Sequence, residues 1–172
     1  SRRAGQVIRR IYSLTRPSDS HFEAVDLAER VTATAALIDG EMRQRSVRLD
    51  HVLQSSLIID GDPVLIEQIL LNLLRNAMDA MRDTPLEQRI IAIELKAADG
   101  YALLEIADRG CGIDAAVADN LFDPLFTTKP EGMGMGLAIC RSVIESHRGR
   151  LSFAPNPGGG TVFRCSFPLS GR

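Results

Sequence analysis

The spacing of apolar residues along the chain predicts helices interleaved with strands. Apolar residues recur at helical spacing over residues 4–16, 25–42, 63–82 and 137–147. Short apolar runs bounded by turn residues predict strands over residues 46–53, 57–60, 90–96, 101–107, 151–153 and 161–167. In the last strand Phe163, Cys165 and Phe167 alternate with polar residues, so one face of that strand is expected to be buried.

Turn residues between these segments indicate how the segments connect. Asp99-Gly100 joins two strands, and residues 156–160 join the last two, so both connections predict antiparallel hairpins. Because helices alternate with these hairpins, the pattern predicts an α/β fold, a two-layer sandwich with helices on one face of a mixed sheet. Residues 108–136 are glycine-rich and irregular, with a short helix expected near residues 115–121.

Two prolines indicate helix boundaries. Pro17 ends the first helix and begins a turn-rich linker, PSDSH. Pro63 suits the first turn of the third helix, and Asp62 before it can accept hydrogen bonds from the free backbone amides of that turn.

A polar stripe runs along the helix predicted over residues 63–82. At about 100° per residue, Gln68, Asn72, Asn76 and Asp79 fall within an arc of about 80°. The opposite side is apolar and consists of Ile66, Ile69, Leu70, Leu73, Leu74, Ala77 and Met81. An ordinary solvated face is one interpretation, but such faces favour Glu and Lys, whereas Asn is a poor helix residue. Two amide oxygens on adjacent turns can instead join a magnesium shell already filled by waters and phosphates.

Three glycine clusters follow. Asp108-Arg-Gly110-Cys-Gly112 comes directly after a strand, where the glycines permit close approach of a ligand and the carboxylate can accept from an amino group. Gly132-Met-Gly134-Met-Gly136 precedes the helix that starts at Leu137, and amides at a helix start suit phosphates. A plain Asp-Gly turn and a ligand-free hinge are the alternatives for these two clusters. Residues 158–160 favour a hairpin turn.

Composition narrows the function classes. With 172 residues the chain can form one domain with a sizeable core, and 24% charged residues are typical of a soluble globular protein. The net charge of −2 does not indicate a nucleic-acid partner. No apolar run approaches the roughly 20 residues that span a bilayer. Cys111, Cys140 and Cys165 lack CxxC spacing, which favours a reducing cytoplasm over disulfides or zinc.

Order and spacing of the motifs carry a family resemblance. The segments are Asn72-Leu-Leu-Arg-Asn76-Ala, Asp108-x-Gly-x-Gly112, Phe122-Asp-Pro-Leu-Phe126-Thr-Thr-Lys129, Gly132-x-Gly-x-Gly136-Leu and Gly158-Gly-Gly-Thr161. They resemble the N, G1, F, G2 and G3 boxes of sensor histidine kinases, which belong to the GHKL ATPase superfamily with the Bergerat fold. The phrase TTKPEGMGMGLAICRSVIESH is most similar to the oxygen-sensor and dicarboxylate-sensor type.

The resemblance implies that ATP and Mg²⁺ are the cofactors. Asn76 would coordinate magnesium, and Asn72 would support the metal and the phosphates. Asp108 would accept a hydrogen bond from the adenine amino group. Gly110 and Gly112 would let the base lie against the end of the sheet, with Ile113 next to them as a further candidate contact.

The remaining boxes imply contacts to the phosphates and the base. Gly132, Gly134, Gly136 and Leu137 would cradle phosphates at the helix start, and Thr161 would close the base pocket. Residues 115–135 would form a lid over ATP, packed by Phe122 and Phe126, with Lys129 a candidate for a phosphate. Asp79, also a candidate contact, departs from the pattern because many members carry a basic residue there. An acidic residue at this place resembles the heat-shock chaperone branch.

The intact enzyme implied by this resemblance transfers the γ-phosphoryl group of ATP to a histidine on a dimerisation helix, and then to an aspartate of a response regulator receiver domain. Residues 1–17 would be the end of the second dimerisation helix, residues 18–24 a linker and residues 25–172 the catalytic domain. Such a protein would be a homodimer, and its full-length form could be soluble or membrane-anchored.

The three histidines lack the surroundings of a phospho-acceptor, which is followed in this family by an acid and a downstream proline. His21 lies in the linker, His51 in a short strand and His147 on the apolar face of its helix. The acceptor helix is therefore expected to lie outside this sequence. Two rival functions remain. A chaperone-type or mismatch-repair-type ATPase would use Glu where Asn72 stands, as the base that activates water, and a non-catalytic nucleotide-sensing module would keep the boxes without transfer.

Overall fold

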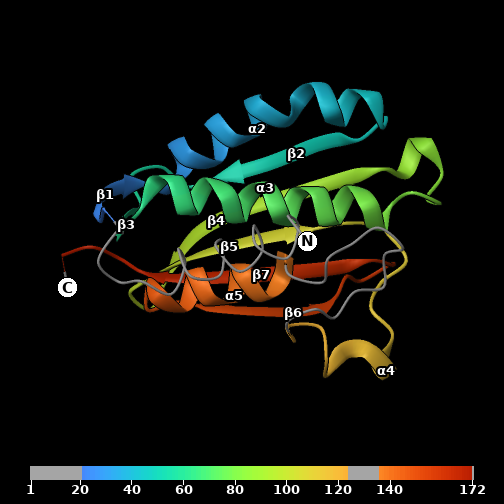
Figure 1. Cartoon of the computed structure of the whole chain (residues 1–172). Helices are drawn as coiled ribbons and strands as arrows, with labels where there is room; N and C mark the ends of the chain where they lie inside the picture. Colours follow the sequence, from blue (N-terminus) through green and yellow to red (C-terminus); the bar gives the residue numbers. More distant parts are fainter. Residues whose placement is uncertain (1–20, 124–135, 172) are drawn as a thin grey trace, which may run out of the picture.

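The computed structural model describes residues 21–123 and 136–171. Within these residues, Figure 1 shows three long helices side by side over one face of a sheet, namely α2 (Leu27–Gln44), α3 (Pro63–Ala80) and α5 (Gly136–Ser146). The described part of that sheet has five strands in the order β2 (Arg48–Leu53), β4 (Ile90–Ala98), β5 (Tyr101–Ala107), β7 (Thr161–Pro168) and β6 (Arg150–Pro155). The smaller elements are β1 (Glu23–Asp26), β3 (Ile58–Gly61), the 3₁₀ helix η1 (Leu86–Gln88) and α4 (Ala115–Ala118).

The sheet is mixed, as the sequence predicted. Strands β2 and β4 pair in parallel, whereas β4–β5, β5–β7 and β7–β6 pair antiparallel. Helix α3 lies on the connection between β2 and β4, which supplies the long crossover that a parallel pair requires. The hairpin between β4 and β5 turns at Asp99 and Gly100, both with positive φ, as in the turns that match strand twist. The predicted two-layer α/β sandwich is therefore confirmed.

The core lies between α3 and the inward faces of the central strands. The buried strand residues include Ile91, Ile93 and Leu95 of β4, Leu104 and Ile106 of β5, and Phe163, Cys165 and Phe167 of β7. Helix α3 buries Ile66, Ile69, Leu70, Leu73, Leu74, Ala77 and Met78 against them. On the outer face of the sheet, Arg164 of β7 pairs with Glu105 of β5 at 2.8 Å. Alternation along the strands thus separates the core from solvent.

Helix α3 begins as its sequence predicted. Asp62 is the N-cap, and its Oδ1 accepts from the backbone amides of Val64 at 3.0 Å and Leu65 at 3.3 Å. Pro63 occupies the first turn, where its missing amide proton costs nothing. The helix ends at Ala80, two residues before the predicted end, with Met81 as its C-cap.

The beginning of the described chain differs from the prediction. Residues 23–26 form β1, which pairs antiparallel with β3 in a separate two-stranded sheet. The sequence predicted a helix from Val25. The side chain of Asp26, the N-cap, accepts from the Glu29 amide, so the helix starts at Leu27, two residues later than predicted. Helix α4 is also shorter than the segment 115–121 expected for it. The predicted helix over residues 4–16 lies outside the described residues.

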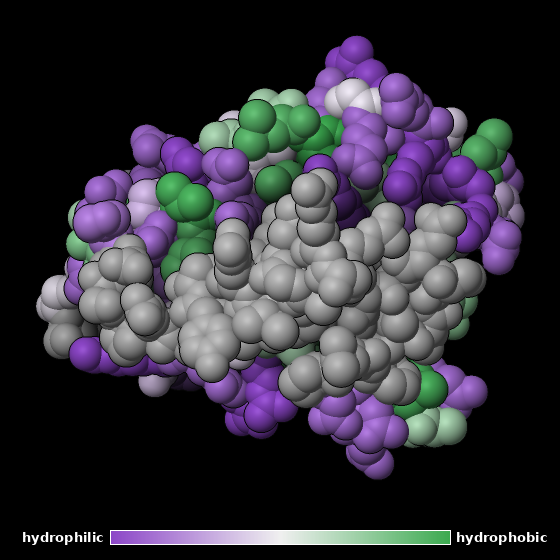
Figure 2. Space-filling view, viewed as in Figure 1, coloured by the Kyte–Doolittle hydropathy of each residue, from purple (hydrophilic) through white to green (hydrophobic). Residues whose placement is uncertain are grey.

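Figure 2 shows a mainly hydrophilic surface over α2, interrupted by an apolar patch, and on this helix Leu37 is exposed. None of the helices in the two described ranges is long and apolar enough to cross a bilayer.

His147 connects the end of α5 to the start of α3. It is buried, and its Nε2 accepts from the Asp62 amide at 3.0 Å. The ring proton is therefore on Nδ1, which lies 2.7 Å from the carbonyl oxygen of Val143 and donates to it. Phe22 stacks on the ring with centroids 4.6 Å apart. His147 is thus a hydrogen-bonded core residue, as its position on an apolar helix face predicted.

The environment of His147 predicts a pH-dependent stability. Burial lowers the pKa of His147 from 6.5, although the hydrogen bond to Val143 and the charge of Asp62 act in the opposite direction. The unfolded chain therefore binds the proton more readily, so this contribution is present above about pH 6.5 and is lost as the pH falls below it. We expect His147→Gln to lower the free energy of unfolding at pH 7.5 by about 1–3 kcal/mol. Below pH 6.5 the difference from the unsubstituted chain should shrink.

The measurement is the free energy of unfolding in urea, determined at several pH values between pH 5 and pH 8. His51→Gln, which removes an exposed imidazole on β2, is the matched control. A difference between His147→Gln and the unsubstituted chain that stays constant over this range would contradict the account.

Candidate nucleotide-binding site

Asp108, the first residue after β5, is a buried carboxylate at the end of the sheet, with 2% of its surface exposed. Its Oδ1 accepts from the backbone amides of Gly110 at 2.9 Å and Thr161 at 3.2 Å. Burial raises the pKa of Asp108 above 3.8, and these two amides act in the opposite direction. Within the described part of the chain, neither of these bonds uses Oδ2. Two backbone donors therefore hold one oxygen of this buried carboxylate at the end of the sheet.

The turn between β6 and β7 packs directly on Asp108. The Asp108 amide donates to the Thr161 carbonyl at 2.9 Å, and the Asn156 side-chain amide donates to the Asp108 carbonyl at 2.7 Å. Gly160 has a φ of +101°, and a Cβ there would lie 2.1 Å from the Asp108 carbonyl oxygen. Only glycine fits this contact, so the predicted hairpin turn also shapes the carboxylate site.

The loop after Asp108 docks on the end of α3. A Cβ at Gly110 would lie 2.4 Å from the Ala80 carbonyl oxygen, and the Cys111 amide donates to the same oxygen at 3.1 Å. Thr84 adds a hydroxyl donor to the carbonyl of Arg109 at 3.0 Å. The close approach that Gly110 permits in this structure is therefore to the protein itself. This contact brings the polar stripe of α3 and the Asp108 loop into one region.

The polar stripe is only partly exposed. Gln68 is exposed, whereas Asn72, Asn76 and Asp79 are half-buried. Asp79 forms an ion pair with Arg45, the C-cap of α2, with its Oδ1 2.7 Å from the guanidinium. The stripe is thus flanked by other elements, unlike a fully solvated helix face.

The start of α5 packs against the same helix. Gly136 and Leu137 are its first residues, and Cys140 one turn later is buried with its Sγ 3.9 Å from the Ile69 carbonyl oxygen. Burial raises the pKa of the Cys140 thiol to about 12, and a hydrogen bond with the side chain of Asn72 acts in the opposite direction. The beginning of α5 therefore lies beside Asn72 of the polar stripe.

The other predicted site residues are placed as follows. Thr161 is buried beside Asp108, and Ile113 is half-buried against the core. Phe122 packs on Phe153 of β6 with ring centroids 5.7 Å apart, and the Arg141 guanidinium lies 5.8 Å from the Phe122 ring. Four predicted residues, Phe126, Lys129, Gly132 and Gly134, lie outside the described residues.

Sequence reasoning did not select three residues that shape this region. These are Asn156, which holds the carbonyl of Asp108, Cys140, which contacts α3, and Arg45, which pairs with Asp79. Asn156 stands in an Asn-Pro-Gly turn, and that turn was the available signal. Cys140 contacts α3 from α5 and Arg45 from the C-cap of α2, so their spacing in the sequence carries no such signal.

Comparison with known proteins assigns the class. Residues 61–171 match the family described as histidine kinase-, DNA gyrase B- and HSP90-like ATPases. The C4-dicarboxylate transport sensor protein DctS of Rhodobacter capsulatus is 41% identical over 170 residues, which are 98% of this chain and 26% of that protein. The sensor protein FixL of Bradyrhizobium diazoefficiens is 36% identical over 169 residues, which are 98% of this chain and 33% of that protein.

Solved structures share the fold. The nucleotide-free catalytic domain of the histidine kinase ThkA superposes with a TM-score of 0.77 at 26% identity, over 87% of this chain and 96% of that one. ThkA in complex with the response regulator protein TrrA gives a TM-score of 0.79 at 23% identity, over 98% of this chain and 48% of that one.

The chain belongs to the family of histidine kinase-, DNA gyrase B- and HSP90-like ATPases. Within that family it has the sequence and fold of the catalytic ATPase domain of two-component sensor histidine kinases, so the resemblance found in its boxes is confirmed. It spans about a quarter to a third of the length of DctS and FixL.

The contact at Gly160 predicts a specific loss of stability. We expect Gly160→Ala to lower the free energy of unfolding by about 2–4 kcal/mol. The new Cβ would sit on a left-handed backbone and would clash with the carbonyl oxygen of Asp108. Gly158→Ala is the matched control, since its φ is +90° but nothing lies within 4 Å of an added Cβ. That variant should lose only about 1–2 kcal/mol. Equal losses in urea unfolding would show that the Asp108 contact contributes nothing.

Proposed function

We propose that this domain binds ATP with Mg²⁺ and transfers the γ-phosphoryl group to a histidine on a dimerisation helix outside this sequence, for relay to an aspartate of a response regulator. The buried Asp108 carboxylate is the observation that carries the nucleotide assignment. Its Oδ1 is held by two backbone amides, so Oδ2 can accept from the amino group of adenine. Guanine has a carbonyl oxygen at the corresponding ring position and would be repelled.

The polar side of α3 would hold the phosphate end of the nucleotide. We assign Asn76 as the magnesium ligand and Asn72 as support for the metal and phosphates, because neutral amide oxygens suit a shell shared with phosphates. When bound, Mg²⁺ would neutralise part of the charge on the phosphates. Asn72 lies beside the start of α5, where the first amides of a helix of 11 residues favour an anion.

The remaining assignments complete the nucleotide site. Gly110, Gly112, Ile113 and Thr161 would surround the base at the Asp108 end of the sheet. Gly132, Gly134, Gly136 and Leu137 would contact phosphates, with Phe126 and Lys129 in the lid. With the base held at Asp108 and the phosphates at α3 and α5, the domain would position the γ-phosphoryl group for in-line attack by an imidazole.

The rival functions have less support. A chaperone-type or mismatch-repair-type ATPase needs a general base where this chain has Asn72, and an amide cannot take a proton from water. The relatives DctS and FixL are sensor proteins, which also favours the kinase over a non-catalytic module.

None of the chain's three histidines supplies an acceptor in this proposal. His147 is buried with both ring nitrogens hydrogen-bonded, and His51 is an exposed residue of β2 without a following acid-and-proline motif. The acceptor histidine of this proposal therefore belongs to a dimerisation helix outside this sequence.

We also propose, from the family resemblance, that residues 1–17 are the end of a dimerisation helix and that residues 18–24 link it to the catalytic domain. The full-length protein would be a homodimer.

The adenine assignment predicts nucleotide selectivity. Asp108→Asn should weaken ATP binding by about 10- to 100-fold, because it removes a charge-assisted hydrogen bond of about 1.5–3 kcal/mol. The free energy of unfolding of this variant should change by less than its free energy of ATP binding, because the Asn carbonyl oxygen can still accept from the amides of Gly110 and Thr161. The measurement is calorimetric titration with ATP and GTP, with Mg²⁺ and with a chelator.

Asp99→Asn, in the turn at the opposite end of β5, is the matched control and should bind ATP as the unsubstituted chain does. Removing Mg²⁺ should weaken ATP binding in both proteins. Equal affinity of the unsubstituted chain for ATP and GTP would show that Asp108 does not read adenine.

A further inference from the structure

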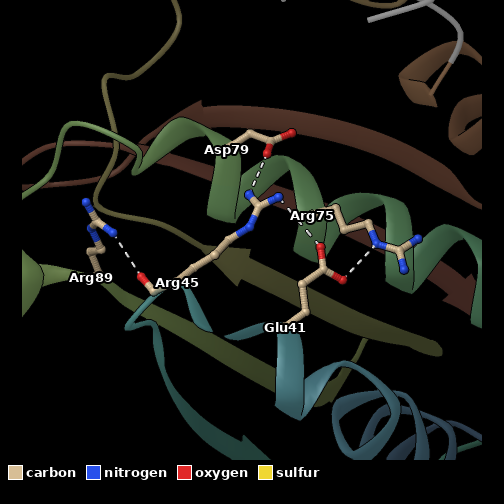
Figure 3. Close-up of polar contacts among 5 residues, drawn as sticks. All are labelled: Glu41, Arg45, Arg75, Asp79 and Arg89. Atoms are coloured by element: carbon tan, nitrogen blue, oxygen red, sulfur yellow. Dashed lines mark hydrogen bonds and ion pairs between the residues drawn. The ribbon is translucent and has the colours of Figure 1, made fainter. Parts of the chain in front are cut away.

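Helices α2 and α3 are connected by a cluster of four charged residues, Glu41, Arg45, Arg75 and Asp79, which we call the α2–α3 ion-pair cluster (Figure 3). The Arg45 guanidinium lies 2.7 Å from Asp79 Oδ1 and 3.7 Å from Glu41 Oε1. Glu41 Oε2 lies 3.3 Å from Arg75. Alternating charges therefore run from α2 onto the side of α3 that carries the polar stripe.

Arg89 holds the backbone of Arg45 in place. Its guanidinium donates to three carbonyl oxygens, those of Thr84 at 2.8 Å, Arg45 at 2.9 Å and Arg82 at 2.8 Å. These oxygens belong to the end of α2 and to the segment after α3. One side chain thus ties both helix ends together, and Figure 3 shows Arg89 beside the Arg45 carbonyl. The position from which Arg45 reaches Asp79 is therefore defined by the fold.

Of the two cluster residues on α3, Asp79 lies closer around the helix to the asparagines than Arg75 does. At about 100° per residue, its side chain falls around α3 between that of Arg75 and those of Asn72 and Asn76. Asn76 and Asp79 are three residues apart, so their Cβ atoms are about 5–6 Å apart. The Asp79 side chain is 22% exposed, so its ion pair with Arg45 is screened less than a fully exposed pair.

We propose that Arg45 is a positioning residue for the phosphate end of the nucleotide site. Through its ion pair with Asp79 it holds the last turns of α3 and balances negative charge one turn beyond Asn76. This inference rests on the proposed function, because it assumes that phosphates approach Asn72 and Asn76. Removing the guanidinium subtracts one positive charge from this side of α3, whatever else Asp79 contacts. The loss of this charge should weaken the binding of a polyphosphate more than it weakens the binding of an uncharged ligand.

The test compares Mg²⁺–ATP with adenosine, which keeps the base but has no phosphates. We expect Arg45→Ala and Arg45→Gln to weaken Mg²⁺–ATP about fivefold, with adenosine affinity changed less than about twofold. Arg45→Gln keeps a hydrogen-bond donor without the charge, so it provides a second variant if Arg45→Ala does not fold. Arg43→Ala is the matched control, because Arg43 is a more exposed arginine two residues before Arg45, and its carboxylate partner is Asp39. Its affinities should match those of the unsubstituted chain.

Charge rescue separates this role from a structural one. Adding Asp79→Asn to Arg45→Gln restores the net charge, so the double variant should bind Mg²⁺–ATP more tightly than Arg45→Gln alone. Equal losses for ATP and adenosine, an unchanged ATP affinity in both Arg45 variants, or no rescue would each overturn the inference. Failure of the unsubstituted chain to bind ATP would instead contradict the proposed function, so the two failures can be distinguished.

Discussion

Burial of one side of α3 is the constraint on which the rest of this domain depends. Seven apolar residues of the helix pack into the core, so its polar stripe has a fixed direction relative to the sheet. The Ala80 carbonyl at its end accepts from Cys111, which places the loop after Asp108 against the same helix. Helix α5 adds Cys140 on another side. The asparagines, the carboxylate and the start of α5 are therefore arranged by core packing.

The Asp108 carboxylate shows what such an arrangement requires. A buried carboxylate is unfavourable unless donors compensate for its lost hydration. Here the donors are the backbone amides of Gly110 and Thr161, and both depend on tight packing. Glycine is needed at residue 110 because Ala80 fills the space of a side chain, and at residue 160 because the Asp108 carbonyl does. Two of the family's glycine positions thus serve the protein's own packing at the proposed base site.

Much of this could be predicted from the sequence because it depends on local pattern. Period-2 alternation in β7, the Asp62-Pro63 cap of α3 and the two-faced pattern of α3 each arise from neighbouring residues, and each was confirmed. Strand β1 was missed because Val25 fits a helix and a strand equally well, and its partner β3 lies more than 30 residues away. The Arg45–Asp79 pair was missed because its partners are also more than 30 residues apart, one at the C-cap of α2 and the other in α3. The roles of the individual site residues rest on the resemblance and remain proposals.

Phosphoryl transfer in trans tests the central claim most directly. The chain would be incubated with γ-labelled ATP, alone and with a separately supplied dimerisation domain that contains the acceptor histidine. The account predicts no label on the chain itself and acid-labile, base-stable label on the added domain. Transfer should be slow and concentration-dependent, because the effective concentration of about a millimolar that a short linker provides is lost. Phosphohistidine on the chain itself, or no label on the added domain while the chain binds ATP, would contradict the account.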